Sequence, residues 1–219
     1  MIYFGEKRKV ETEVLFALLS VATLNMIIFA SLSPTNTPNI LLDAAQDAVI
    51  VYGTSIVAML FLILKKKSHL LKYVFYGLLL FITLRVFSNL YWLVIDKRIS
   101  DNGTAMLFDA FLIWMVSILV FSLWYWIVDR GGPVARATDK DKTRCDLLFP
   151  QYQGNIQGWE HWHPKFLDYV FFSFFTSTGF SPADTLPLTK RVKMLMMCEA
   201  FLSLVIIGMV TTRAISLLQ

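Results

Sequence analysis

Charged residues are scarce in this chain. Asp, Glu, Lys and Arg make up 16% of its 219 residues, whereas a soluble domain carries about 25%. Hydrophobic residues make up 56%, and the mean hydropathy is +0.58. One water-soluble core does not bury this much apolar side chain, but a lipid bilayer covers it. The few charges fall between apolar runs, which argues against a nucleic-acid partner despite the net charge of +4. We therefore expect an all-α integral membrane protein.

Cysteine is also rare, and the signatures of common enzyme classes are absent. Cys145 lies in a polar loop and Cys198 in an apolar run, so neither a disulfide nor a cysteine-based metal site is expected. The sequence contains no P-loop, nucleophile elbow, HExxH or GxGxxG pattern. It therefore predicts a protein that is not an enzyme and has no cofactor, although a bound monovalent cation is compatible with the sequence.

One polar stretch, WEHWH, invites a metal or acid–base interpretation. Glu160, His161 and His163 are close in sequence, but the chain has only one other histidine to complete a ligand set. The stretch also holds Trp159 and Trp162, which are typical of the headgroup region. We therefore favour an interfacial anchor, and a metal site or an enzyme is a distant alternative.

Apolar runs long enough to cross a bilayer dominate the rest of the sequence. About 20 helical residues span the hydrocarbon core. Five runs meet that length, near residues 14–32, 44–64, 70–95, 105–128 and 192–218. The first follows three basic residues but is longer than the apolar region of a signal peptide, so we expect it to be a retained span. The predicted organisation is a four-span bundle (1–129), a polar loop (130–163) and a C-terminal module (164–219).

The C-terminal module begins with an apolar segment that is too short to cross. Its apolar part, 166–175, has about ten residues, a length that suits a re-entrant or interfacial helix. Pro164 is suited to the first turn of a helix and Gly179 to its end. Non-helical backbone at membrane depth survives only where protein or water covers it. Two interpretations stay open: a re-entrant pore-type helix over 164–178, or a surface helix followed by an ordinary loop.

From Asp168 onward the chain reads DYVFFSFFTSTGFSPADTLPLTKRVKMLMMCEAFLSLVIIGMVTTRAISLL. This stretch resembles the pore helix, filter and inner helix of bacterial potassium channels with a two-helix pore. In that family a pore helix ending in threonines is followed by a T-V-G-Y-G-D filter, a P-x-T turn and an inner helix with a Glu-Ala pair and a terminal Ala-Arg. The matching residues here are Thr176, Ser177, Thr178, Gly179, Phe180 and Ser181 in the filter stretch, Asp184 near the acid, Pro187 and Thr189 in the turn, and Glu199, Ala200 and Arg213 in the inner helix. The resemblance implies a homo-oligomer, with a tetramer favoured.

Departures from that pattern bear on selectivity. Ser181 stands where the family has its second filter glycine, Thr178 replaces valine, and Pro182-Ala183 is inserted before the acid. Glycine adopts positive φ at no steric cost, so its loss argues for a looser K⁺/Na⁺ site. The loop is also similar to the single-glycine filters of Trk/HKT-type cation transporters. The C-terminal half, with LWYWIVDRGGP and FSPADTLPLT, resembles more closely a widespread family of uncharacterised prokaryotic membrane proteins.

Basic residues are distributed unequally between the two sides of the predicted bundle. With five crossings, Lys97 and Arg98 are the only ones on one side. Cationic loops face the cytoplasm, so the N-terminus and the loop 130–163 are expected there, in a prokaryotic plasma membrane. The resembled channels have the filter loop outside. Charge bias and resemblance therefore disagree about orientation.

A few polar residues lie within the predicted spans. Arg85 is near the middle of the third span, and Asp47 and Asp109 are each about a turn inside theirs, which suggests an Asp47–Arg85–Asp109 network. We expect this network to join helices rather than to sense voltage. Glu199 should face protein or water, either as a support for the filter or as a buried acid bonded to a neighbouring helix.

Together these features predict a channel-like protein that conducts monovalent cations through a homo-oligomeric pore with a degenerate TSTGFS filter. In this hypothesis 164–178 is the pore helix, 177–181 the filter and 192–218 the pore-lining helix. The alternative is a non-conducting membrane scaffold or sensor that keeps the module as a packing unit.

Overall fold

The computed structural model describes residues 68–95, 103–132, 145–152, 156–158, 162–179 and 184–216. The spans expected near 14–32 and 44–64 lie outside these ranges. The elements are α3 (Ser68–Ile95), α5 (Gly103–Val128), the 3₁₀ turn η1 (Asp129–Gly131), β1 (Leu147–Leu148), the 3₁₀ turn η2 (Pro150–Tyr152), α7 (Phe166–Thr178), β2 (Leu186–Pro187) and α8 (Lys190–Ser216).

Long apolar helices dominate the described residues. Two of them are long and apolar enough to cross a membrane: Leu107–Gly131, with mean hydropathy 2.2, and Lys190–Thr212, with 2.1. Only 22% of the apolar window in Lys190–Thr212 is buried, so most of its hydrophobic surface faces outward, unlike the core helix of a soluble protein. In α3 the apolar stretch is shorter, Phe75–Tyr91. A helical class with membrane-crossing helices is therefore compatible with the structure.

The described chain divides into two compact units. One unit includes Ile118–Gly208, which holds the second half of α5, α7, most of α8 and the segments that connect them. The other includes α3, the first half of α5 and the end of α8. The first unit contains most of the C-terminal module.

Helix α7 is short and is capped at both ends. The Lys165 backbone N–H donates to Asp168 Oδ2 at 2.6 Å, which stabilises the first turn. Gly179 ends the helix with φ +75°, and its N–H donates to Thr176 O at 3.3 Å. The 13 residues give α7 a length of about 20 Å, less than the roughly 30 Å of a hydrocarbon core. The predicted end at Gly179 is confirmed, while Pro164 precedes the helix instead of forming its first turn.

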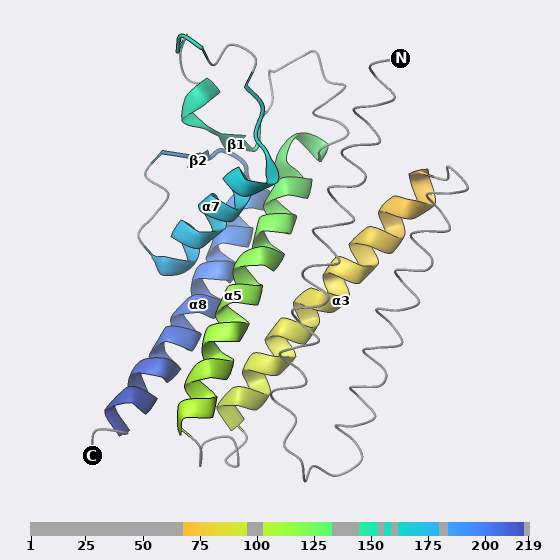
Figure 1. The fold of residues 1–219 in the computed structure, drawn as a ribbon. Helices are drawn as coiled ribbons and strands as arrows, with labels where there is room; N and C mark the ends of the chain where they lie inside the picture. Colours follow the sequence, from red (N-terminus) through yellow and green to blue (C-terminus); the bar gives the residue numbers. More distant parts are fainter. Residues whose placement is uncertain are drawn as a thin grey trace. The chain divides into compact units, whose positions relative to one another are not determined.

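Helix α7 and strand β2 form the two limbs of a hairpin (Figure 1). Phe166, at the start of α7, packs on Trp126 near the end of α5, with ring centroids 5.4 Å apart. After α7 the chain returns to β2, which pairs antiparallel with β1 in the register Leu147↔Pro187 and Leu148↔Leu186. Helix α8 starts directly after β2. The chain therefore descends as a helix, returns, and descends again as α8.

Candidate functional site

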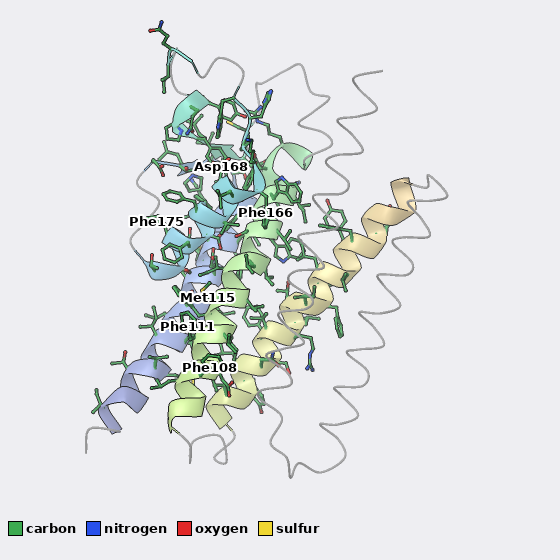
Figure 2. All side chains as sticks on the ribbon, viewed as in Figure 1. Phe108, Phe111, Met115, Phe166, Asp168 and Phe175 are labelled. Carbon is green, nitrogen blue, oxygen red and sulfur yellow. The ribbon has the colours of Figure 1, made fainter. Side chains whose placement is uncertain are left out.

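The hairpin packs on α5 and α8 through one face of α7. Its buried residues are Tyr169, Phe172, Ser173, Thr176 and Ser177. Phe172 makes an edge-to-face contact with Tyr125 of α5, with centroids 4.8 Å apart. Figure 2 shows Phe166 and Asp168 where α7 begins beside α5. Four of these five residues carry a hydroxyl group, so polar bonds as well as packing hold the short helix.

Glu199 of α8 is fully buried between α5 and α7. The Tyr125 hydroxyl donates to Glu199 Oε2 at 2.6 Å, and Ser173 of α7 lies in very short hydrogen-bond contact with Glu199 Oε1. The Ser173 Oγ is also 2.8 Å from the Ile118 carbonyl oxygen of α5. One carboxyl therefore joins all three helices at the level of Ser173.

The proton count of this cluster permits two arrangements. A serine hydroxyl has one proton, so Ser173 donates either to Glu199 or to the Ile118 carbonyl. If it donates to Glu199, both hydroxyls serve an ionised carboxylate. If it donates to Ile118, the Glu199 carboxyl supplies the proton between Glu199 and Ser173. Because both arrangements satisfy the buried oxygens, the cluster holds the helices together whether or not it carries a proton.

A second carboxyl, Asp129, directly follows α5 and joins its end to α7. Its side chain is fully buried. Oδ1 accepts the backbone N–H groups of Asp146 at 3.2 Å and Leu147 at 3.3 Å, and Oδ2 accepts the Tyr169 hydroxyl at 2.6 Å. The Asp146 carboxylate in turn accepts the Arg130 N–H at 2.8 Å. Asp129 therefore ties the start of β1 and the first half of α7 to the end of α5.

An aromatic cap covers this end of the unit. Phe149 contacts Trp162 and Tyr169 edge-to-face, each with centroids 5.5 Å apart, and Trp162 also contacts Tyr152. The Arg130 guanidinium lies 4.6 Å from the centre of the Tyr152 ring. Arg130 itself has φ +53°, an uncommon conformation for a non-glycine residue, where the chain turns away from α5. The cap is thus a packed structure and not a loose connection.

The two carboxyl clusters repeat one pattern. Tyr169 and Ser173 are four residues apart on α7 and share a helix face. Tyr125 of α5 and Asp129, the first residue of η1, have the same spacing. Tyr125 of α5 donates to Glu199, and Tyr169 of α7 donates to Asp129. Sequence reasoning missed Tyr125, Asp129, Tyr169 and Ser173. The signal that could have found them is a tyrosine and a second polar residue at i, i+4 in apolar helices.

The predicted filter residues begin inside the helix. Thr176 and Ser177 are buried, and Thr178 is half-buried; their hydroxyls donate to the carbonyls of Phe172, Phe174 and Phe175 in the same helix. Non-helical backbone starts at Gly179, which is exposed. Phe180 and Ser181 lie outside the described residues. Asp184 is exposed on the return limb.

Glu199 contacts α7 at Ser173, one turn before Thr176. It is buried against neighbouring helices, as expected. Arg85 is half-buried and Asp109 is buried, and both take part in interactions. Asp47 lies outside the described residues, so the Asp47–Arg85–Asp109 network stays a prediction.

The part of the chain that the structure describes contains no set of side chains suited to bind a metal ion. No group of three or more His, Cys, Asp or Glu side chains there could hold an ion. His163 is exposed, while Glu160 and His161 fall outside that part. Cys145 and Cys198 are free thiols, as expected.

Comparison with known proteins yields no relative: no family model matches the chain, and neither a curated protein nor a solved structure matches it.

Proposed function

We propose that this chain is a channel-like membrane protein that conducts monovalent cations, K⁺ or Na⁺, through a pore shared by several copies. In this proposal α7 is the pore helix, the stretch 177–181 is the filter, and α8 lines the pathway. The observation that carries the proposal is the hairpin of α7 and β2. It enters beside α5, ends at Gly179, and returns to the level of β1 before α8 begins.

The depth of this hairpin supports a polar pathway. Ser173 lies beside the carbonyl of Ile118, ten residues before the end of α5, which corresponds to about 15 Å along a helix. Five residues of α7 follow Ser173 before the helix ends. If α5 and α8 cross the membrane, Gly179 lies well inside the hydrocarbon layer. Non-helical backbone at that depth requires water or protein around it.

Exposed apolar surface on the same unit supports several copies around that turn. The α7 side chains of Leu167, Phe171 and Phe174 are 74%, 49% and 40% exposed. On α8 the exposed apolar residues are Met194, Met197, Phe201, Leu204 and Ile207. One copy does not enclose a pathway, because Gly179 is open on one side. Further copies of this chain, making four in total by the family resemblance, would enclose the pathway and cover part of this surface.

A flux assay in liposomes tests the proposal. The wild-type protein should carry K⁺ or Na⁺ down a gradient, and Gly179→Ala should reduce or abolish this flux because alanine is strained at φ +75°. Gly77→Ala is the matched control: it also has no heavy atom near an added Cβ, but it lies in α3 and has no positive φ. Wild-type liposomes that are as tight as protein-free ones would refute conduction, and a flux unchanged by Gly179→Ala would refute a pathway through the turn that begins at Gly179.

The second candidate is a non-conducting scaffold or sensor, favoured by the tight intrachain packing of the hairpin. The hydroxyls of Thr176, Ser177 and Thr178 all bond carbonyls within α7, so none of them is committed to an ion. A monomer in detergent, together with absence of flux, would support this candidate. Tetramers with Gly179 on the symmetry axis would count against it.

A further inference from the structure

Asp129 lies outside the filter-like stretch but binds the hairpin that carries this stretch. Both limbs of this hairpin depend on the same carboxylate. Oδ2 binds the helical limb directly through the Tyr169 hydroxyl at 2.6 Å. Oδ1 binds the backbone of Asp146 and Leu147.

The second link reaches the return limb through the small sheet. Leu147 is the first residue of β1, and it pairs with Pro187 of β2. The Leu188 N–H also donates to the Asp146 carbonyl at 2.9 Å. The return limb is therefore attached to the same two residues that Asp129 binds.

The separation of the two limbs follows from these attachments. The helical limb ends at Gly179, and Thr185 directly precedes β2 on the return limb. Asp129 fixes the helical limb through Tyr169 and the return limb through β1 and β2.

We infer that Asp129 is a positioning residue, which sets the distance between the helical limb α7 and the return limb at β2. Its relevance to ion selectivity rests on the proposed function, whereas the positioning itself does not. Glu199 differs in this respect: its hydroxyl partners lie on α5 and α7, and its own helix follows the hairpin.

A pair of identical substitutions tests the inference. Tyr169→Phe and Tyr125→Phe each remove one hydroxyl from a fully buried tyrosine that donates to a buried carboxyl at 2.6 Å. Only Tyr169→Phe disconnects α7 from Asp129. Spin labels at Phe174→Cys and Leu186→Cys, two exposed positions on the two limbs, report the distance between limbs in a background with Cys145→Ser and Cys198→Ser.

The expected result is a broadened or shifted label-to-label distance in Tyr169→Phe and an unchanged distance in Tyr125→Phe. Asp129→Asn, which keeps an oxygen for the β1 amides but presents an amide where the tyrosine donated, should also broaden it. Equal broadening in both tyrosine variants would show general loosening and overturn the inference. No broadening in Tyr169→Phe, or broadening confined to Tyr125→Phe, would overturn it as well.

Flux through the same variants separates this inference from the proposed function. If the protein conducts, Tyr169→Phe should change the ratio of K⁺ to Na⁺ flux, and Tyr125→Phe should leave that ratio unchanged; a ratio that both variants change alike, or that neither changes, counts against the inference. If wild-type liposomes show no flux, conduction fails, and the distance measurement still decides whether Asp129 positions the limbs.

Discussion

A buried carboxyl among apolar helices is stable only when donors reach its oxygens. Glu199 has two such donors, on two different helices. Glu199→Ala should therefore lower the free energy of unfolding by about 2 kcal/mol, because the Tyr125 hydroxyl is left buried without its acceptor while Ser173 keeps the Ile118 carbonyl. Glu199→Gln keeps one acceptor oxygen and should cost less, about 1 kcal/mol.

Titration with a denaturing detergent in mixed micelles measures both values. Met197→Ala is the control on the same helix, since that side chain is 65% exposed and should change the unfolding free energy by less than about 0.5 kcal/mol. A Glu199→Ala protein as stable as Met197→Ala would mean that the carboxyl does not hold the three helices together.

Gly179 supplies a second prediction at the scale of the residue. Nothing lies within 4 Å of an added Cβ, so the cost of Gly179→Ala comes from the backbone at φ +75° alone. We expect a loss of about 1 kcal/mol in unfolding free energy for alanine and a smaller loss for Gly179→Asn, because asparagine tolerates this conformation. The same titration should show the opposite sign for Gly208→Ala, a helical glycine with equally open surroundings, where alanine favours the helix. An equal loss in Gly179→Ala and Gly179→Asn would contradict the backbone explanation.

Sequence reasoning reached some of these residues and not others for a physical reason. Glu199 could be predicted because an acid inside an apolar run has to face protein or water. Its partner Tyr125 is 74 positions away, and a tyrosine is common in any membrane helix, so nothing local identified the pair. Asp129 directly follows the predicted span 105–128, yet its bonds to Tyr169 and Leu147 depend on how the following chain folds back. Long-range polar partners are fixed by tertiary structure.

At the scale of the element, α7 has one buried face and one exposed face. Phe172 is fully buried against Tyr125, whereas the neighbouring Phe171 is 49% exposed. Phe172→Ala should destabilise the protomer by about 3 kcal/mol, because it leaves a cavity and removes an aromatic contact. Phe171→Ala should change protomer stability by less than about 0.5 kcal/mol. Unfolding of both variants in detergent measures the difference, and equal losses would mean that α7 does not pack on α5 through this face.

The limits of the helices were the most predictable part of the fold. The run expected at 105–128 is α5, Gly103–Val128, and the run expected from 192 is α8, which starts at Lys190. Apolar length and the flanking polar residues define such helices locally. The two-residue strands β1 and β2 were not predicted, because Leu147–Leu148 and Leu186–Pro187 are too short to show any alternation. Their pairing depends on the hairpin between them, as does the aromatic cap.

At the scale of the whole molecule, the cap end of the described unit collects cations. Arg130, Lys165, Lys190, Arg191 and Lys193 all belong to this end, at the end of α5 or the start of α7 and α8. Positive residues stay in the cytoplasm during insertion, because translocating them is costly. The hairpin would then enter the membrane from the cytoplasmic side, opposite to the channels that the sequence resembles.

Cys145 reports this orientation directly. It is half-buried and lies next to Asp146, whose N–H donates to Asp129, so it marks the cap end. In a Cys198→Ser background, a membrane-impermeant maleimide should label Cys145 in inverted vesicles and leave it unlabelled in intact cells with the outer face accessible. Labelling in detergent gives the maximum signal, and Ile156→Cys, at a 44% exposed position between η2 and α7 in the sequence, provides a second reporter.

Labelling of both reporters in intact cells would reverse the assignment. The cations of the cap end would then face outward against their usual preference, and the hairpin would enter from outside, as in the resembled channels. Labelling confined to inverted vesicles would instead require any conduction pathway to open toward the cytoplasm through the turn after Gly179. The negative end of the α7 dipole, at Gly179, would then meet cations that arrive from the opposite face of the membrane. Orientation therefore decides from which side a cation would reach this helix end, and it does so before any current is measured.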